Sequence, residues 1–284
     1  MVQDWIAVDW RETRQRAWAM RGTDLRDRRE RVAASGDVAG DLGALIGDWL
    51  AQDATLVLAC GALGPVGGAV PCKPLPDGLW SVDAGDPRID LRVVPGLRQA
   101  APVDLMRGDE TRIAGFLALN KDWDGVLCLV GEETRWVHVS AGEVVSFQSF
   151  LTGAMFDALA RGRLSGDGLL GAETDLAAFS EALSDAMAKP ERVMARIHGV
   201  HAARVLEGLE PPVARARLFG ALLGAELAAA RPFWLGQQLA VVGDGEVARL
   251  YVEALSAQGA PAALADEARV TLEGLKSAWR LLAG

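Results

Sequence analysis

Two segments of the chain follow the same plan of apolar strand, polar turn and second strand. The first, IAVDWRETRQRAWAM, covers residues 6–20, and the second, VLCLVGEETRWVHVS, covers residues 126–140. Both carry Glu-Thr-Arg in or beside the turn and a tryptophan in the second strand. A duplicated domain leaves this kind of internal similarity behind. The pattern therefore predicts two related halves, each of which opens with a hairpin.

Apolar periodicity predicts a mixture of strands and helices along the whole chain. Strands are expected at residues 5–8, 16–20, 55–60, 91–94, 126–130, 136–139, 144–147 and 237–242. Helices are expected at residues 37–51, 112–119, 150–161, 176–188, 190–206, 213–230, 246–258 and 266–283. This mixture indicates the α/β class, and 284 residues suffice for two domains. No low-complexity linker separates the halves, so the boundary is expected within residues 112–124.

Composition excludes several classes of partner. The formal net charge of −9 argues against nucleic-acid binding, which needs a basic face. No apolar segment reaches the roughly 18–20 residues of a membrane span, and the N-terminus lacks the features of a signal peptide. A cytoplasmic protein without a membrane partner is expected. The three cysteines are far apart and odd in number, which does not suggest disulfides, and Cys60 and Cys128 lie in apolar runs that predict burial.

A series of short motifs in a fixed order carries a resemblance to a known family. They are Asp9-Trp10 with Arg16-Ala17-Trp18, Gly61–Gly64, Val93–Leu97, Met106-Arg107-Gly108-Asp109-Glu110-Thr111, Gly131 with Trp136-Val137, Leu151-Thr152-Gly153, Gly220–Glu226, Val242-Gly243-Asp244 and Trp279-Arg280. Over nearly its whole length the chain resembles the 2-dehydro-3-deoxygalactonokinase family, within the actin/hexokinase/heat-shock ATPase superfamily.

The resemblance implies an α/β fold of two ribonuclease-H-like (actin-like ATPase) domains with a central cleft. They would comprise residues 1–115 and 116–284, with the last helix packing back on the N-terminal domain. The implied reaction transfers the γ-phosphate of ATP to the 6-hydroxyl of 2-dehydro-3-deoxy-D-galactonate, in galactonate or galactose catabolism. ATP and Mg²⁺ are the implied cofactors and a small sugar acid is the implied partner. A homodimer is compatible with the sequence.

The first hairpin turn keeps part of the family's phosphate loop. The resemblance implies that Asp9 is a catalytic residue that holds Mg²⁺ through water, and that Thr13 and Arg14 bind nucleotide. The glycine that usually follows Asp-Trp is Arg11 here, and Glu12 adds a negative charge. A carboxylate near a triphosphate costs on the order of 1–4 kcal/mol. Arg11 and Arg14 could offset this cost by pairing with phosphate.

The second hairpin turn departs from the family in a similar way. The resemblance implies that Gly131, Thr134 and Arg135 bind nucleotide, together with Gly220 and Gly243. A hydroxyl and a histidine of the family are replaced by Glu132 and Glu133, and Ala154 stands where an acid is usual. Two simpler interpretations stay open: both turns are ordinary solvated hairpins, and Gly220-x-x-x-Gly224 serves close helix packing.

The segment from Met106 to Thr111 is intact. The resemblance implies that Arg107 binds the substrate carboxylate in a bidentate pair, and that Asp109 or Glu110 accepts the proton of the attacked hydroxyl. Thr111 would line the substrate site with Gly61 and Gly64. The simpler interpretation is a helix N-terminus with acids in its first turn, where the helix dipole favours them. A strand-to-helix turn equally explains the glycine cluster at residues 61–68.

Two functional hypotheses follow. The first is an active sugar-acid kinase, which rests on the retained acids, on Arg107 and on Gly131. The second is a degenerate pseudokinase that binds a sugar acid without ATP turnover, which rests on Arg11, on Glu12 and on the changed second turn. A purely structural role is a third hypothesis, against which the intact segment from Arg107 to Thr111 argues.

Overall fold

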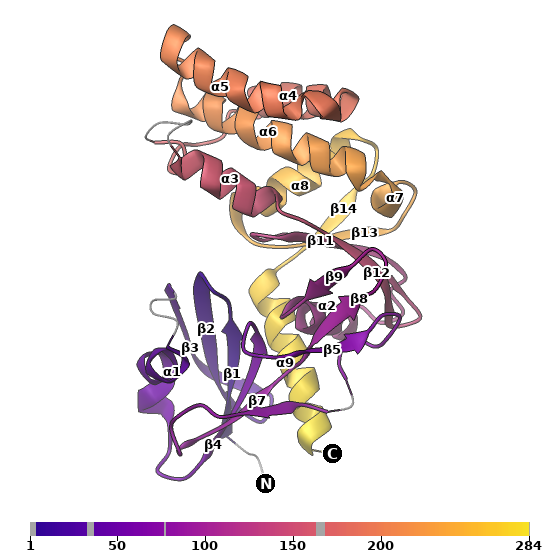
Figure 1. Cartoon of the computed structure of the whole chain (residues 1–284). Coiled ribbons are helices and arrows are strands. Elements are labelled where there is room, and N and C mark those ends of the chain that lie inside the picture. Colours follow the sequence, from indigo (N-terminus) through magenta and orange to yellow (C-terminus); the bar gives the residue numbers. More distant parts are fainter. Residues whose placement is uncertain (1–3, 33–36, 77, 163–167, 284) are drawn as a thin grey trace. The chain divides into compact units, whose positions relative to one another are not determined.

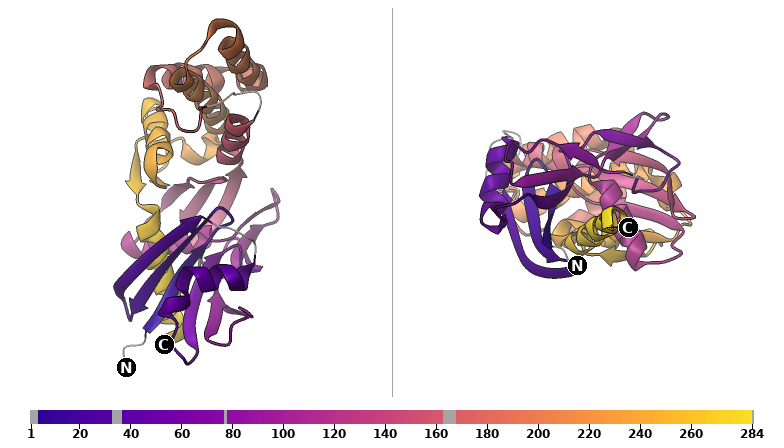
Figure 2. Two further views of the ribbon diagram at one scale, coloured as in Figure 1. Left: turned by 90° about the vertical axis from the view of Figure 1, so that its left-hand side faces the viewer. Right: turned by 90° about the horizontal axis from the view of Figure 1, so that it is seen from below.

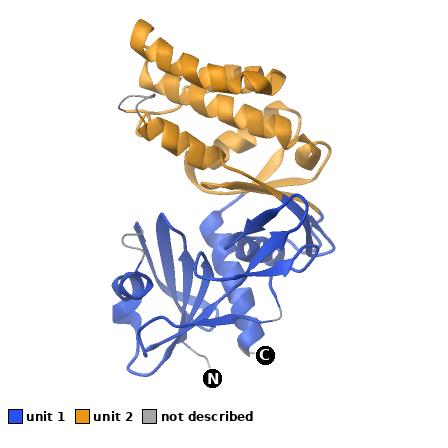
Figure 3. Ribbon diagram, viewed as in Figure 1, with its two compact units in different colours: residues 1–124, 139–147, 265–284 blue, residues 125–138, 148–264 orange. Residues whose placement is uncertain are grey.

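The chain folds into two compact units in a computed structural model, which describes residues 4–32, 37–76, 78–162 and 168–283 (Figure 1). Unit 1 comprises residues 1–124, 139–147 and 265–284, and unit 2 comprises residues 125–138 and 148–264 (Figure 3). The C-terminal helix thus belongs to the same unit as the N-terminal strands.

Unit 1 is built mainly from strands. Its elements are β1 (Asp4–Trp10), β2 (Arg14–Arg21), β3 (Asp24–Val32), α1 (Val38–Ile46), η1 (Gly47–Trp49), β4 (Thr55–Gly61), β5 (Val66–Ala69), β6 (Trp80–Val82), β7 (Ile89–Val93), β8 (Gly96–Gln99), β9 (Asp104–Met106), α2 (Asp109–Leu119) and α9 (Glu267–Ala283).

The main sheet of unit 1 has the strand order β3-β2-β1-β4-β7-β6. β1 pairs antiparallel with β2 and parallel with β4, and β4 pairs parallel with β7. Alternate residues of β1 enter two cores: Ile6 and Val8 pack with α1, whereas Trp5 and Ala7 pack with α9. Helices therefore cover both faces (Figure 2), which explains why a central strand is apolar at almost every position.

Helices α2 and α9 cross at close range because each presents a glycine to the other. A Cβ on Gly115 would lie 1.7 Å from the carbonyl oxygen of Val270, and a Cβ on Gly274 would lie 1.9 Å from that of Thr111. No side chain fits at these distances. The contact fixes the first turn of α2, which carries Asp109 and Glu110.

Unit 2 combines one sheet with a layer of helices. Its elements are β10 (Gly125–Leu129), β11 (Thr134–Ser140), β12 (Glu143–Phe150), α3 (Thr152–Arg161), α4 (Leu176–Ala188), η2 (Pro190–Arg192), α5 (Val193–Glu207), α6 (Pro211–Ala229), α7 (Arg231–Trp234), β13 (Leu239–Val242), α8 (Gly245–Ala257) and β14 (Ala262–Ala265). The ends of β11 and β12 that meet at residues 139–147 are grouped with unit 1.

The sheet of unit 2 has the order β12-β11-β10-β13-β14, and β10 pairs parallel with β13. Unit 1 has the same order at the corresponding strands, β3-β2-β1-β4-β7. This repeated order agrees with the duplication that the two similar hairpin segments predict. Within unit 2, α4 lies directly on α6, because Gly220 and Gly224 let the helix backbones approach.

Most predicted elements are present, with boundaries shifted by a few residues. The sequence did not predict β3, which is polar and largely exposed, or the short strands β5, β6, β8, β9 and β14. Helix α2 begins at Asp109 rather than at Arg112. Cys60 and Cys128 are buried, as expected. Among the described residues, no helix combines the length and apolarity of a membrane-spanning segment.

Candidate active site

In unit 1, three loops meet at the carboxyl ends of the parallel strands β1 and β4. Gly61 ends β4 with φ of +105°, and a Cβ there would lie 2.0 Å from the carbonyl oxygen of Trp10. A Cβ on Gly108, which precedes α2, would lie 3.1 Å from Cα of Gly61. Only glycine tolerates both the backbone conformation and the contact. In open α/β sheets, ligands bind at this edge.

Asp9 is the acid at the centre of this edge. It lies on β1 directly opposite Arg16 of β2, and Nη2 of Arg16 donates to Oδ2 of Asp9 at 2.7 Å. Nε of Arg11 lies 3.4 Å from the same oxygen, and Nη2 of Arg112 lies 3.7 Å from Oδ1. The carboxylate is 1 % exposed. Three guanidinium groups therefore surround one buried carboxylate.

Glu267, the first residue of α9, completes this cluster. Its carboxylate pairs with Arg11, with Arg14 at 2.5 Å and with Arg16 at 3.2 Å, and it lies 3.5 Å from Nε of Arg112. Arg112 also pairs with Asp109. The guanidinium cluster, as we call it below, therefore consists of Arg11, Arg14, Arg16 and Arg112 with the acids Asp9, Asp109 and Glu267.

The cluster holds Asp9 in its ionised form. Burial by itself would raise the pKa of Asp9, but the charges of Arg11, Arg112 and Arg16 lower it well below its usual value. Each neighbouring charge at about 4 Å is worth about 4 kcal/mol at an effective dielectric constant of 20. Asp9 is therefore an anion whose charge the protein already neutralises.

The intact segment from Met106 to Thr111 forms the turn into α2. Gly108 N–H donates to both carboxylate oxygens of Glu110, at 2.9 and 2.7 Å, and the Thr111 hydroxyl donates to Oε1 at 3.0 Å. Burial raises the pKa of Glu110 to about 8, although these hydrogen bonds oppose the shift. Glu110 therefore holds its proton at neutral pH and caps its own turn.

The other predicted substrate-side residues surround the same turn. Arg107 is exposed and donates to the carbonyl oxygen of Ala62 at 3.3 Å, which brings it beside the glycine loop. Gly64 faces the strand end at Val94, whose carbonyl oxygen would lie 2.8 Å from a Cβ. Thr111 is fully buried. Thr13 is exposed at the tip of the first hairpin.

Unit 2 has a comparable arrangement at the carboxyl ends of β10 and β13. A Cβ on Gly153 would lie 2.2 Å from the carbonyl oxygen of Gly131, and Ala154 N–H donates to Glu132 O at 2.8 Å. A Cβ on Gly243 would lie 3.2 Å from Cβ of Val130. The loop after β10, the start of α3 and the loop after β13 therefore meet, and they bring Gly131 and Gly243 to one edge.

A network of buried polar side chains lies in the interior of unit 2, next to this edge. Glu226 of α6 accepts hydrogen bonds from Nε1 of Trp136 at 2.9 Å and from the Tyr251 hydroxyl at 2.8 Å. Burial raises the pKa of Glu226, against hydrogen bonds from Thr152, Trp136 and Tyr251 that lower it. The hydroxyls of Thr134 and Tyr251 lie 2.9 Å apart. Thr134 therefore faces this interior network.

The remaining predicted nucleotide residues of unit 2 lie in different surroundings. Arg135 is 8 % exposed and pairs with Glu133, whereas Glu132 and Glu133 themselves are exposed. Gly220 lies on the face of α6 that packs against α4, where a Cβ would lie 2.7 Å from the carbonyl oxygen of Phe179. Gly220 therefore lies in the contact between α4 and α6, as expected if Gly220-x-x-x-Gly224 serves close helix packing.

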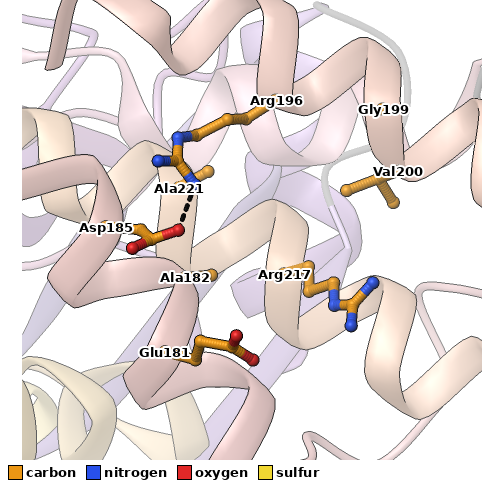
Figure 4. A pocket seen from close by; sticks show the side chains of 8 residues that line it. All are labelled: Glu181, Ala182, Asp185, Arg196, Gly199, Val200, Arg217 and Ala221. Atoms are coloured by element: carbon orange, nitrogen blue, oxygen red, sulfur yellow. Dashed lines mark hydrogen bonds and ion pairs between the residues drawn. The ribbon is translucent and has the colours of Figure 1, made fainter. Parts of the chain in front are cut away.

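A further recess of about 320 Å³ lies among α4, α5 and α6 (Figure 4). In it, Arg196 reaches across to pair with Asp185. Its lining is Glu181, Ala182, Asp185, Arg196, Gly199, Val200, Arg217 and Ala221. The two arginines and two acids balance in charge. None of these residues belongs to the loops that carry Gly131, Gly153 and Gly243.

The model of one protein family, described as 2-keto-3-deoxy-galactonokinase, matches residues 9–278. This match spans both hairpin turns and the intact segment from Met106 to Thr111 at the start of α2. The chain belongs to this family. A probable 2-dehydro-3-deoxygalactonokinase of Rhizobium meliloti (strain 1021) is 32% identical over 199 residues, which is 68% of this chain and 65% of that protein.

Two further relatives cover nearly the whole chain. The 2-dehydro-3-deoxygalactonokinase of Escherichia coli (strain K12) is 26% identical over 277 residues, covering 91% of each protein. The crystal structure of a putative 2-dehydro-3-deoxygalactonokinase from Sinorhizobium meliloti has a TM-score of 0.86 at 26% identity and covers 97% of this chain and 96% of that one. The chain therefore has the actin- and hexokinase-like ATPase fold.

The fold extends beyond this family. Component A of (R)-2-hydroxyglutaryl-CoA dehydratase from Acidaminococcus fermentans has a TM-score of 0.58 at 12% identity and covers 99% of this chain and 100% of that one. At such low identity the likeness concerns the fold alone.

A kinase family implies ATP and a metal ion, usually Mg²⁺, so the fit of Asp9 to a metal can be tested. Mg²⁺ prefers a carboxylate that is open to water molecules and to phosphate oxygens. Here three guanidinium groups lie within 4 Å of the Asp9 oxygens. The described residues contain no group of three or more His, Cys, Asp or Glu side chains that could hold a metal. In this arrangement Asp9 does not fit a bound metal ion.

Sequence reasoning did not assign a role to several residues of these sites. Arg16 could have been found, since Asp9 and Arg16 lie opposite each other once the hairpin turn is placed, and opposite charges favour such pairs. Arg112 follows Asp109 by three residues, and opposite charges at this spacing pair on a helix surface. Glu267 and Glu226 gave no local signal, because their partners are far away in the sequence.

Proposed function

We propose that this protein is an ATP-dependent kinase of 2-dehydro-3-deoxy-D-galactonate that phosphorylates the 6-hydroxyl. The family match over residues 9–278 carries this proposal. The intact turn from Arg107 to Thr111 beside Gly61 supports it, because it joins an exposed arginine to two carboxyl groups. A cytoplasmic location and a homodimer stay predictions.

In this mechanism the chain positions two reactants. Arg107 binds the carboxylate of the sugar acid, and Gly61 and Gly64 let the loop beside it pack closely against the backbone of Trp10 and Val94. The oxygen of the 6-hydroxyl attacks the γ-phosphorus, the bond to the β-phosphate oxygen breaks, and the hydroxyl proton passes to a carboxylate. Phosphoryl transfer needs mainly such positioning and charge stabilisation. Thr13, Arg14, Gly131, Arg135 and Gly243 would contact the nucleotide.

Of the two acids, Asp109 is the better proton acceptor. Glu110 holds a proton at neutral pH and its carboxyl group faces Gly108 and Thr111. Asp109 instead forms an ion pair with Arg112, which holds its carboxylate in place. Asp109→Asn is therefore expected to lower kcat by about 10²-fold or more, whereas Glu110→Gln lowers it less than tenfold. Asp86→Asn, in an exposed turn, is the matched control.

The activity is tested by coupled detection of ADP release with Mg·ATP and a panel of sugar acids. Turnover of 2-dehydro-3-deoxy-D-galactonate above that of the other acids supports the proposal. No turnover of any acid, with the Escherichia coli relative active under the same conditions, refutes it. Nuclear magnetic resonance of the product determines which hydroxyl carries the phosphate.

The pseudokinase is the second candidate, and one observation favours it: Arg11 pairs with Asp9 and Glu267 at the first hairpin turn. Under this hypothesis the sugar acid binds and ATP does not. Calorimetry distinguishes the two functions, because binding of the sugar acid alone supports the pseudokinase and binding of ATP contradicts it.

A further inference from the structure

Glu226 of α6 is a buried acid of unit 2 that the proposed mechanism does not use. It is 3 % exposed, and its carboxyl group lies among donors from three other elements. Oε1 accepts from Nε1 of Trp136 at 2.9 Å, and Oε2 accepts from the Tyr251 hydroxyl at 2.8 Å. The Thr152 hydroxyl donates to the same carboxyl group. One side chain of α6 therefore joins β11, α8 and α3.

Each of these three elements adjoins a loop at the carboxyl ends of β10 and β13. β11 follows the turn that contains Gly131, α3 begins one residue before Gly153, and α8 follows the loop that contains Gly243. These are the segments that meet at the edge of the unit 2 sheet. Glu226 therefore binds, from the interior, the element next to each loop of this edge.

The backbones at this edge are packed closely enough to transmit a displacement. A Cβ on Gly153 would lie 2.2 Å from the carbonyl oxygen of Gly131. A Cβ on Gly243 would lie 2.9 Å from Cβ of Ala248 in α8. Ala248 precedes Tyr251 by three residues, and both side chains are buried on the same side of α8. A shift of the start of α3 or of α8 would therefore displace the loops themselves.

The hydroxyl of Thr134 completes the network. Thr134 and Trp136 lie two residues apart on β11, so their side chains point to the same face of the strand, and both are fully buried. The hydroxyls of Thr134 and Tyr251 lie 2.9 Å apart. A buried polar group that loses its partner is costly. The network therefore stabilises one arrangement of β11, α3, α6 and α8.

We propose that Glu226 is a positioning residue of the nucleotide site, which holds the three loops of unit 2 in the arrangement that binds ATP. The inference rests on the proposed function, in which Gly131 and Gly243 contact the nucleotide. Glu226 is buried and acts only through the elements that it joins. Phosphoryl transfer depends mainly on positioning. Loss of this acceptor therefore weakens the binding of ATP, whereas the sugar-acid residues of unit 1 keep their arrangement.

The test replaces Glu226 by methionine, which has a similar length and no oxygen. Glu226→Met is expected to raise KM and Kd for Mg·ATP at least tenfold, while KM for the sugar acid changes less than twofold. Glu226→Gln keeps an acceptor for the N–H of Trp136 and is expected to stay within threefold of the wild type. Ile197→Ala, a buried position of α5, is the control for a general loss of stability and should leave both KM values unchanged.

A second measurement follows the loops directly, by amide hydrogen exchange with mass spectrometry. Exchange in residues 131–135 and 151–155 is expected to be at least tenfold faster in Glu226→Met than in the wild type, and unchanged in Ile197→Ala. If Glu226→Met does not fold, which circular dichroism establishes, Tyr251→Phe takes its place. This change removes one hydroxyl of the network and is expected to raise Kd for Mg·ATP at least threefold.

Two outcomes overturn the inference: an unchanged affinity for Mg·ATP in the folded variant of Glu226 or Tyr251, or an equal loss of affinity in Ile197→Ala. Its failure can be told from failure of the proposed function. Sugar-acid turnover with an unchanged KM for ATP in Glu226→Met refutes the inference alone. ATP binding that weakens in Glu226→Met, without turnover of any sugar acid by the wild type, refutes the kinase alone. No ATP binding by the wild type refutes both.

Discussion

The carboxyl group of Glu110 should make the stability of this protein depend on pH in an unusual direction. It is fully buried at the start of α2. Burial raises its pKa from 4.5 to about 8. Between these two values the unfolded chain has released the proton while the folded chain still holds it. Unfolding then releases a proton, so the free energy of unfolding must fall as pH rises through this window.

The size of the effect follows from the two pKa values. One pKa unit is worth 1.36 kcal/mol, so the full window from 4.5 to about 8 corresponds to about 5 kcal/mol. A domain is typically stable by roughly 5–15 kcal/mol. This single side chain can therefore account for a large share of any loss of stability between pH 5 and pH 8.

Urea unfolding of the wild type and of Glu110→Gln at several pH values between 5 and 8 measures this share. The variant cannot ionise, so its free energy of unfolding should fall by about 4 kcal/mol less than that of the wild type across this range. Glu253→Gln, an exposed position on α8, is the control and should follow the wild type. Parallel pH profiles for the wild type and Glu110→Gln would refute the reasoning, because Glu110 would then ionise equally in both states.

Three further predictions concern packing and buried charge. Glu267→Gln removes the counter-charge of Arg11 and Arg14 and is expected to lower the free energy of unfolding by about 3–5 kcal/mol; a loss under 1 kcal/mol in urea unfolding would contradict the role of the cluster. Gly115→Ala should lower the free energy of unfolding by about 3 kcal/mol or more, since its Cβ would overlap the backbone of α9. Gly43→Ala, which has open space around it in α1, should instead raise it by about 1 kcal/mol. Equal shifts of the melting temperature in the two variants would contradict the close helix crossing. Glu226→Ala leaves the buried N–H of Trp136 without its acceptor and should cost about 2–4 kcal/mol, a prediction that unchanged unfolding would disprove.

Most helices and strands of the structure could be predicted from the sequence. The apolar runs of β1, β4 and β10 are buried on both faces, and a strand in that position has few alternatives to aliphatic side chains. The amphipathic helices likewise follow their periodicity. β3 was missed because its residues, DLRDRRERV, are mostly charged. As an outer strand of the sheet it needs no apolar pattern to pair with β2.

The candidate site could be predicted only in part. Its glycines and the turn from Arg107 to Thr111 are local motifs, and they do lie together at the edge of unit 1. The inward direction of the Arg11 side chain and the complete burial of Glu110 could not be derived from local motifs. A side chain that departs from a family motif can point toward solvent or toward the interior, and spacing along the chain does not distinguish these directions.

By itself, the sequence determined the α/β class, the repeated hairpin and the family, because these depend on periodicity and on short motifs in order. The tertiary structure decided the charge of the site. It brought Glu267 to within ion-pair distance of Arg11, Arg14 and Arg16, some 250 residues away along the chain, and it buried Glu110 deeply enough to keep its proton. Electrostatic energies depend on the distances between charges and on their burial. Neither quantity can be obtained from the pattern of residues along the chain.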